Sequence, residues 1–173
     1  MDKDPEVTRM IGMSYLNSQE FAQAAFYLKQ AESMGMSPAL VAIPLACAHF
    51  NLGDLQQTQK YLLEAQEDNL RSVEGEALLD SIVTCCFENN RAHEARRIIE
   101  RLVLRYPSYP KILDALGIAC IKEGDFHKAI EAHKALAALT PNNPEVIRRL
   151  AGLFAKTGDL PNAHYWFAKS DRN

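Results

Sequence analysis

The sequence predicts an all-α protein in which one helix-turn-helix unit recurs five times. A small residue follows a turn at regular intervals of 34, 37, 34 and 34 residues, at Ala24, Thr58, Ala95, Ala129 and Ala163. Apolar residues inside the units follow the spacing of one helical face, and proline and glycine stand at the unit ends. A fixed period in this range is typical of a solenoid, in which each unit packs against its neighbours.

The predicted units follow one another in a single array over residues 1–173. Their ranges are 5–38, 39–72, 76–109, 110–143 and 144–173, with a short insertion at 73–75. Pro110 and Pro144 are 34 residues apart, as are Gly124 and Gly158, so these features keep the same phase. Because one hairpin cannot bury its own apolar stripe, the units must stack, and we expect ten antiparallel helices.

The unit at 110–143 shows why each part of the repeat folds as it does. Its first helix has apolar residues at 112, 113, 116, 119 and 120, the spacing of one buried stripe. Gly124 ends this helix because glycine tolerates the left-handed conformation, and Asp125 can cap the next helix. Ala129 lets the two helices approach closely, in a second helix that is also expected to bury Phe126, Ile130 and Leu136. Pro141 and Pro144 separate this unit from the next.

These units resemble the tetratricopeptide repeat family over almost the whole chain. In the fourth unit the family's preferred positions hold Leu113, Leu116, Gly117, Cys120, Ala129, His133, Leu136 and Pro141. The first unit offers Ile11, Gly12, Tyr15, Ala24, Leu28 and Ala31, and the third offers Leu79, Ile82, Cys86, Ala95, Ile99, Leu102 and Pro107. The sequence departs from the family at Thr58, which replaces the small alanine, and at His133, which replaces an aromatic residue. The resemblance implies a right-handed superhelical array.

Pro44 lies inside the expected first helix of the second unit. A proline there removes one intrahelical hydrogen bond and clashes with the preceding turn. Either the helix starts late, near Val41, or it kinks at Pro44, and we favour the late start.

In this family, ligands usually lie in a concave groove lined by the first helix of each unit. Carried over to this chain, the groove residues are Arg9, Met13, Leu16, Asn17, Ile43, Cys47, Phe50, Asn51, Asp80, Thr84, Phe87, Lys111, Asp114, Ile118, Ile121, Lys122 and Arg148. One interpretation is that these side chains pack against the neighbouring helix. The other is a groove for an apolar or amphipathic peptide, which the recurrence of apolar residues at one pair of positions favours.

The carboxylate clamp of chaperone-binding family members is not predicted. Its positions hold Arg9, Met13, Pro44, Ala77 and Ser81 in the first window. The last window keeps only Arg149. A terminal carboxylate would lack paired donors, so we do not expect heat-shock chaperone tails as ligands.

The sequence predicts no metal, no cofactor and no enzymatic activity. The stretch "HEARR" at 93–97 has Arg97 where a zinc-binding helix needs its second histidine. Cys85 and Cys86 are adjacent, so they point to different sides of a helix, and Cys86 and Cys120 occupy an apolar repeat position. We therefore expect core thiols. No nucleophile–base constellation and no glycine-rich phosphate loop is recognised.

The second helix of the third unit has a basic side, formed by Arg91, Arg96, Arg97, Arg101 and Arg105. Glu94 can pair with Arg97 and Arg101 on the helix surface. We therefore favour a solvated, salt-bridged face over a docking patch for an acidic partner. The helix lacks the interleaved aromatic residues that RNA binding requires, and the net charge of -3 provides no bulk attraction to nucleic acid.

The start of the chain, "MDKDPEVTRM", lacks the apolar core of a secretory signal, and no apolar run reaches the roughly 20 residues that span a bilayer. We expect a cytoplasmic protein; the alternative is a periplasmic or secreted fragment without its leader. The last unit runs out after Tyr165, Trp166 and Phe167 without a capping helix. This predicts either a piece of a longer protein or self-association, which size measurements at several concentrations test.

We therefore predict a non-catalytic scaffold or adaptor for protein–protein interaction, which binds a peptide or amphipathic helix within a larger assembly. One alternative is a structural module that self-assembles through its terminal repeats. Another is a chaperone for one specific client protein. The expected partner is a protein or peptide, with no nucleic acid and no insertion into a membrane.

Overall fold

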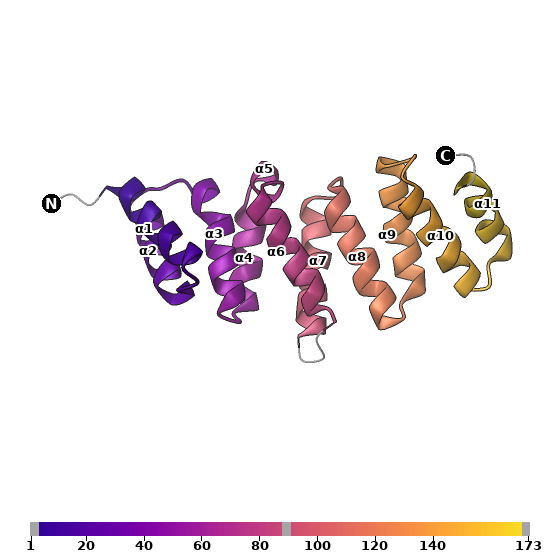
Figure 1. The fold of residues 1–173 in the computed structure, drawn as a ribbon, viewed down its shortest axis with the longest axis horizontal. Coiled ribbons are helices and arrows are strands. Elements are labelled where there is room, and N and C mark those ends of the chain that lie inside the picture. The colour runs from indigo at the N-terminus through magenta and orange to yellow at the C-terminus, as the bar shows by residue number, and fades with distance from the viewer. Residues whose placement is uncertain (1–3, 88–90, 171–173) are drawn as a thin grey trace. The chain divides into compact units, whose positions relative to one another are not determined.

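The computed structural model describes residues 4–87 and 91–170, and every regular element in these ranges is a helix (Figure 1). The helices are α1 (Pro5–Asn17), α2 (Phe21–Ser33), α3 (Pro38–Asn51), α4 (Leu55–Glu64), α5 (Glu67–Leu70), α6 (Val73–Cys85), α7 (Ala92–Arg105), α8 (Pro110–Glu123), α9 (Phe126–Leu139), α10 (Pro144–Lys156) and α11 (Leu160–Ser170). The predicted all-α class is confirmed. Parts of the third and fifth predicted units, at 88–90 and 171–173, lie outside the described residues.

The chain forms two compact units, residues 1–80 and 81–173, with the division inside α6. In the first unit α1 packs on α2, α2 on α3 and α3 on α4, and α1 also contacts α3. In the second unit α7 packs on α8, α8 on α9, α9 on α10 and α10 on α11. Within each unit, helices therefore pack on their neighbours in sequence, as in helical-repeat proteins.

The described residues form eleven helices, one more than the ten expected, and α5 is the addition. Residues 73–75, predicted as an insertion, form the first turn of α6. The Gly75 N–H donates to Ser72 Oγ at 3.1 Å, so Ser72 caps α6. A Cβ on Gly75 would lie 2.6 Å from the carbonyl oxygen of Leu70, which is itself fully buried. The three extra residues thus extend the start of α6, which packs tightly against the end of α5.

The prediction that the first helix of the second unit starts late, near Val41, is wrong. α3 begins at Pro38, where a proline suits the first turn because its missing N–H has no intrahelical acceptor there. Pro44 lies in the helix interior and cannot donate to the carbonyl of Leu40. Residues on nearly every side of α3 are buried, so tertiary packing stabilises a helix that local preference alone would interrupt.

The predicted glycine-aspartate turn is confirmed. Gly124 has φ 78°, in the left-handed region, and ends α8. Asp125 then caps α9 by accepting a hydrogen bond from the Lys128 N–H at 3.2 Å. The same turn recurs between α3 and α4, where Gly53 has φ 82° and the Asp54 carboxylate accepts from a backbone N–H at 3.0 Å.

Small residues bring the two helices of a pair close together. A Cβ on Gly12 of α1 would lie 2.8 Å from Cγ of Leu28 on α2. On α8, a Cβ at Gly117 would lie 2.1 Å from Cε1 of His133 on α9, which is closer than two carbon atoms can approach. Ala129 is fully buried in the same α8–α9 interface. The absence of a side chain at Gly117 is therefore what admits the imidazole ring.

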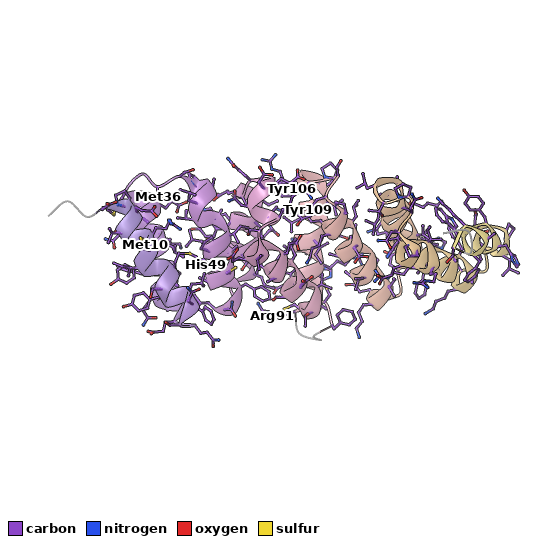
Figure 2. The ribbon with its side chains drawn as sticks, turned by 45° about the horizontal axis from the view of Figure 1, so that its top comes forward. Met10, Met36, His49, Arg91, Tyr106 and Tyr109 are labelled. Atoms are coloured by element: carbon purple, nitrogen blue, oxygen red, sulfur yellow. The ribbon has the colours of Figure 1, made fainter. Side chains whose placement is uncertain are left out.

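Two histidines are buried in the core. His133 has no exposed surface, and its Nδ1 lies 2.9 Å from the Ala129 carbonyl oxygen while its Nε2 lies 3.8 Å from Asp114 Oδ1. His49, labelled in Figure 2, stacks on Tyr61 with ring centroids 5.6 Å apart. Burial lowers the pKa of both imidazoles. Both rings are therefore packed in the core as neutral groups.

We expect the protein to lose stability as the pH falls from 7 to 5. The folded state holds the pKa of His133 and His49 below the value near 6.5 of an unfolded chain, so the unfolded state binds more protons over this range. Urea denaturation at a series of pH values measures the effect. His133→Phe should weaken the dependence of the free energy of unfolding on pH. An unaltered slope in His133→Phe would contradict this interpretation.

Gly117→Ala and Gly152→Ala make a matched pair, since both glycines lie inside helices. The methyl group at position 117 would overlap the His133 ring, and we expect a loss of about 1–3 kcal/mol in the free energy of unfolding. At position 152 a Cβ would meet no atom within 4 Å, so the higher helix propensity of alanine should add up to about 1 kcal/mol. Denaturant melts compare the two. Equal effects would show that the close approach at Gly117 is not limiting.

Candidate functional site

Two of the predicted groove residues on α1 already contact other residues of the first unit. Arg9 Nη2 lies 2.5 Å from Glu6 Oε1, and this hydrogen bond lowers the pKa of Glu6. Leu16 packs against a cluster of buried alanines from α2 and α3, and is only partly buried there. Met13 is half-buried and Asn17 is exposed. α1 thus presents a half-covered apolar surface beside a paired charge.

The predicted residues on α3 divide between core and surface. Ile43 is only 3% exposed, so it follows the packing interpretation and offers no surface to a ligand. Cys47 and Phe50 are half-buried, and the exposed Asn51 donates its side-chain N–H to the Cys47 carbonyl at 2.8 Å. Burial, aided by the carboxylate of Glu74, raises the pKa of Cys47 to about 11. This thiol is protonated at neutral pH and is a poor nucleophile.

Asp80 is the remaining predicted groove residue of the first unit. It lies on α6 and is exposed.

In the second unit, an aromatic ring and a lysine form an exposed patch. Phe87 comes directly after α6 in the chain, and its side chain is 49% exposed. The Lys122 ammonium lies 5.3 Å from the Phe87 ring centroid, within reach of a cation–π interaction. Ile118 and Ile121 lie on the same side of α8 as Lys122 and are half-buried, with Ile121 packed against the core. We call these four residues the Phe87 patch. Thr84, on α6, is also exposed.

The predicted charged residues of the second unit are unequally paired. Asp114 Oδ1 accepts from Arg149 Nη1 at 2.5 Å, and Arg149 also binds Glu145 at 2.5 Å. Arg149, the one clamp residue that the sequence retains, is therefore occupied by the protein's own carboxylates. Arg148 is exposed, and no carboxylate of the described residues lies within 4.0 Å of its guanidinium. Lys111 is half-buried on the first turn of α8.

The predicted groove residues fall in two sets, one in each compact unit. α1 and α3, which are in contact, carry the first set together with Asp80 of α6. The second unit contains the Phe87 patch and the other predicted residues, which are Thr84, Lys111, Asp114 and Arg148. A groove continuous through all five repeats stays a prediction.

Most of the cysteine thiols and two of the histidines are buried. Cys85, Cys86 and Cys120 are buried free thiols, and burial raises the pKa of Cys86 to about 11. The two imidazoles that lie near carboxylates, His49 and His133, are buried where no substrate can reach them. Among the described residues no three histidine, cysteine or acidic side chains are placed to hold a metal ion.

Within residues 4–87 and 91–170, no helix combines the length and the apolar character that crossing a bilayer requires.

Apolar side chains are exposed on α1 and on α11. Met10, on the outer side of α1, is 59% exposed (Figure 2), and Ile11, which the repeat pattern placed at a packing position, is also exposed. On α11, Tyr165 is 60% exposed, whereas Trp166 packs against the core of the second unit. Self-association through these surfaces stays a prediction.

The salt-bridged face predicted for the arginine-rich helix is not formed as expected. Glu94 was expected to pair with Arg97 and Arg101, but in the described part of the chain no ion pair joins them. Leu104, which the repeat pattern does not single out, is 83% exposed on the same side of α7. The signal was available, because Leu104 lies three residues after Arg101 and therefore shares its helical face.

Solved structures of MamA have a similar fold. MamA AMB-1 is 21% identical to this chain with a TM-score of 0.58, over 97% of this chain and 90% of that chain. MamA 41-end from Desulfovibrio magneticus RS-1 is 21% identical with a TM-score of 0.53, over 97% and 93%. A further crystal structure of MamA protein is 17% identical with a TM-score of 0.61, over 98% and 91%.

No protein-family model matches the chain, and no curated protein does. The identity to MamA is low enough that the likeness shows the fold alone. Together with the helix pairs described above, it is consistent with tetratricopeptide-type repeats.

Proposed function

We propose that this chain is a non-catalytic scaffold or adaptor that binds a peptide or amphipathic helix of a partner protein. The observation that carries the proposal is the Phe87 patch, where a half-exposed aromatic ring, two isoleucines and a lysine share one surface. Covering the exposed half of the Phe87 side chain would contribute about 0.8–1.5 kcal/mol of binding free energy, half the value for a fully exposed side chain. An array of such surfaces suits a protein that assembles others into a larger complex.

The chemistry of the patch indicates the kind of peptide. Its apolar side chains favour an aliphatic or aromatic residue of the partner, and Lys122 favours an acidic residue beside it. The half-buried Phe50 of α3 is the corresponding aromatic residue in the first unit. A chaperone for one client would use the same surfaces, and the co-purification of an aggregation-prone client would distinguish it from an adaptor. We place this function in the cytoplasm.

Replacing Phe50 and Phe87 with lysine should reduce the amount of captured partner at least about tenfold, the effect of removing roughly 1.4 kcal/mol of binding. Tagged wild-type protein and the double variant are compared side by side in affinity capture from native lysate, with quantitative mass spectrometry. Circular dichroism checks that the double variant keeps the helical content of the wild type.

Phe26→Lys is the matched control, because Phe26 lies on α2 and is more exposed than Phe87. It should capture the same proteins as the wild type. If the double variant also captured them undiminished, these surfaces would not be the binding site.

A further inference from the structure

The outer side of α7 carries a row of cations around one apolar residue. Arg97, Arg101, Leu104 and Arg105 have the i, i+4, i+7, i+8 spacing of one helical face, and all four are exposed. The opposite side of α7 is buried in the second unit. We call these four residues the α7 stripe.

The carboxylates near α7 are engaged by a different arginine. Arg96, whose side chain is 11% exposed, forms ion pairs with three carboxylates of the second unit. They belong to Glu100, Glu123 and Asp125, with Arg96 Nε 3.1 Å from Glu100 Oε1 and Nη2 3.3 Å from Asp125 Oδ2. Glu100 also lies 3.7 Å from the Lys128 ammonium. The three carboxylates are thus paired with Arg96, and that of Glu100 also with Lys128.

The outer arginines keep their charge available. Within residues 4–87 and 91–170 no carboxylate, that of Glu94 included, lies within 4.0 Å of the Arg97 or Arg101 guanidinium. Arg105 is oriented by a neighbour, since its guanidinium carbon lies 5.5 Å from the ring centroid of the buried Tyr106, in the connection from α7 to α8 (Figure 2). Leu104 is 83% exposed between these cations.

We propose that the α7 stripe binds an acidic segment of a partner protein. Arginine pairs with carboxylates through two parallel hydrogen bonds, and Leu104 offers an apolar contact to an aliphatic residue of that segment. Arg97 and Arg105 are about 12 Å apart along the helix axis, which matches acidic residues at four-residue spacing on a partner helix. This inference goes beyond the proposed function, because no predicted groove residue lies on α7.

The composition of the stripe favours protein over other polyanions. α7 contains no aromatic residue from Ala92 to Arg105, so it has no platform on which nucleobases could stack. Leu104 alone is too small an apolar surface to insert into lipid headgroups. The chain's net charge of -3 adds no general attraction to either polyanion.

The test uses a fluorescein-labelled helical peptide with three glutamates at four-residue spacing and a leucine between the second and third. Fluorescence anisotropy measures its binding to the full chain. We expect binding that weakens as the sodium chloride concentration rises, and at least about tenfold weaker binding to Arg97→Glu/Arg101→Glu. A peptide with lysine in place of glutamate should bind this variant better than the wild type. If the charge-reversed variant fails to fold, Arg97→Gln/Arg101→Gln replaces it in the same measurement.

Lys29→Glu/Lys60→Glu is the matched control, because it makes the same change in net charge on α2 and α4. It should bind the glutamate peptide within about twofold of the wild type. The proposal is overturned if the wild type does not bind that peptide, or if the control loses as much affinity as the stripe variant. It is also overturned if a single-stranded oligonucleotide, vesicles of equimolar phosphatidylserine and phosphatidylcholine, or a second copy of the chain occupies the stripe more tightly than the peptide.

Discussion

The close contact between the two helices of each pair is the constraint on which the rest of the structure depends. At Gly117 there is room for the His133 ring only because no Cβ is present, and a Cβ at Gly12 would likewise lie within 3.0 Å of Leu28, at 2.8 Å. Helices that approach this closely bury their apolar stripes in the interface and against the next pair. The outward sides of the first helices are then left to solvent, and this is where the Phe87 patch lies. The surface that we propose for binding is therefore a consequence of how the core is packed.

The sequence predicted most of the local structure because its signals are local. Gly124 and Asp125 specify a helix end and a cap from two neighbouring residues, and the period of the small residues places the helix pairs. α5 was missed because it is one turn held by the burial of Leu70, which is a tertiary effect. For the same reason Pro44 was misjudged: packing around α3 outweighs the hydrogen bond that the proline removes.

The candidate site was less predictable, because burial and pairing depend on neighbours distant in sequence. Ile43 occupies a groove position of the repeat, yet it is buried. Spacing within one helix suggested that Glu94 would neutralise the arginines of α7. Instead, Glu123 and Asp125, from the end of α8 and the turn that follows it, bind Arg96. The outer arginines are left available, which no pattern within α7 could reveal.

Site-specific photo-crosslinking tests most directly whether the first-helix surfaces hold the partner. A benzophenone amino acid is placed at position 87, at position 121 or at position 26 of the full chain, and adducts are identified after irradiation in cells. The proposed function predicts adducts with the same partner from positions 87 and 121, and none from position 26 on α2. Adducts from position 26 alone, with none from position 87, would contradict it.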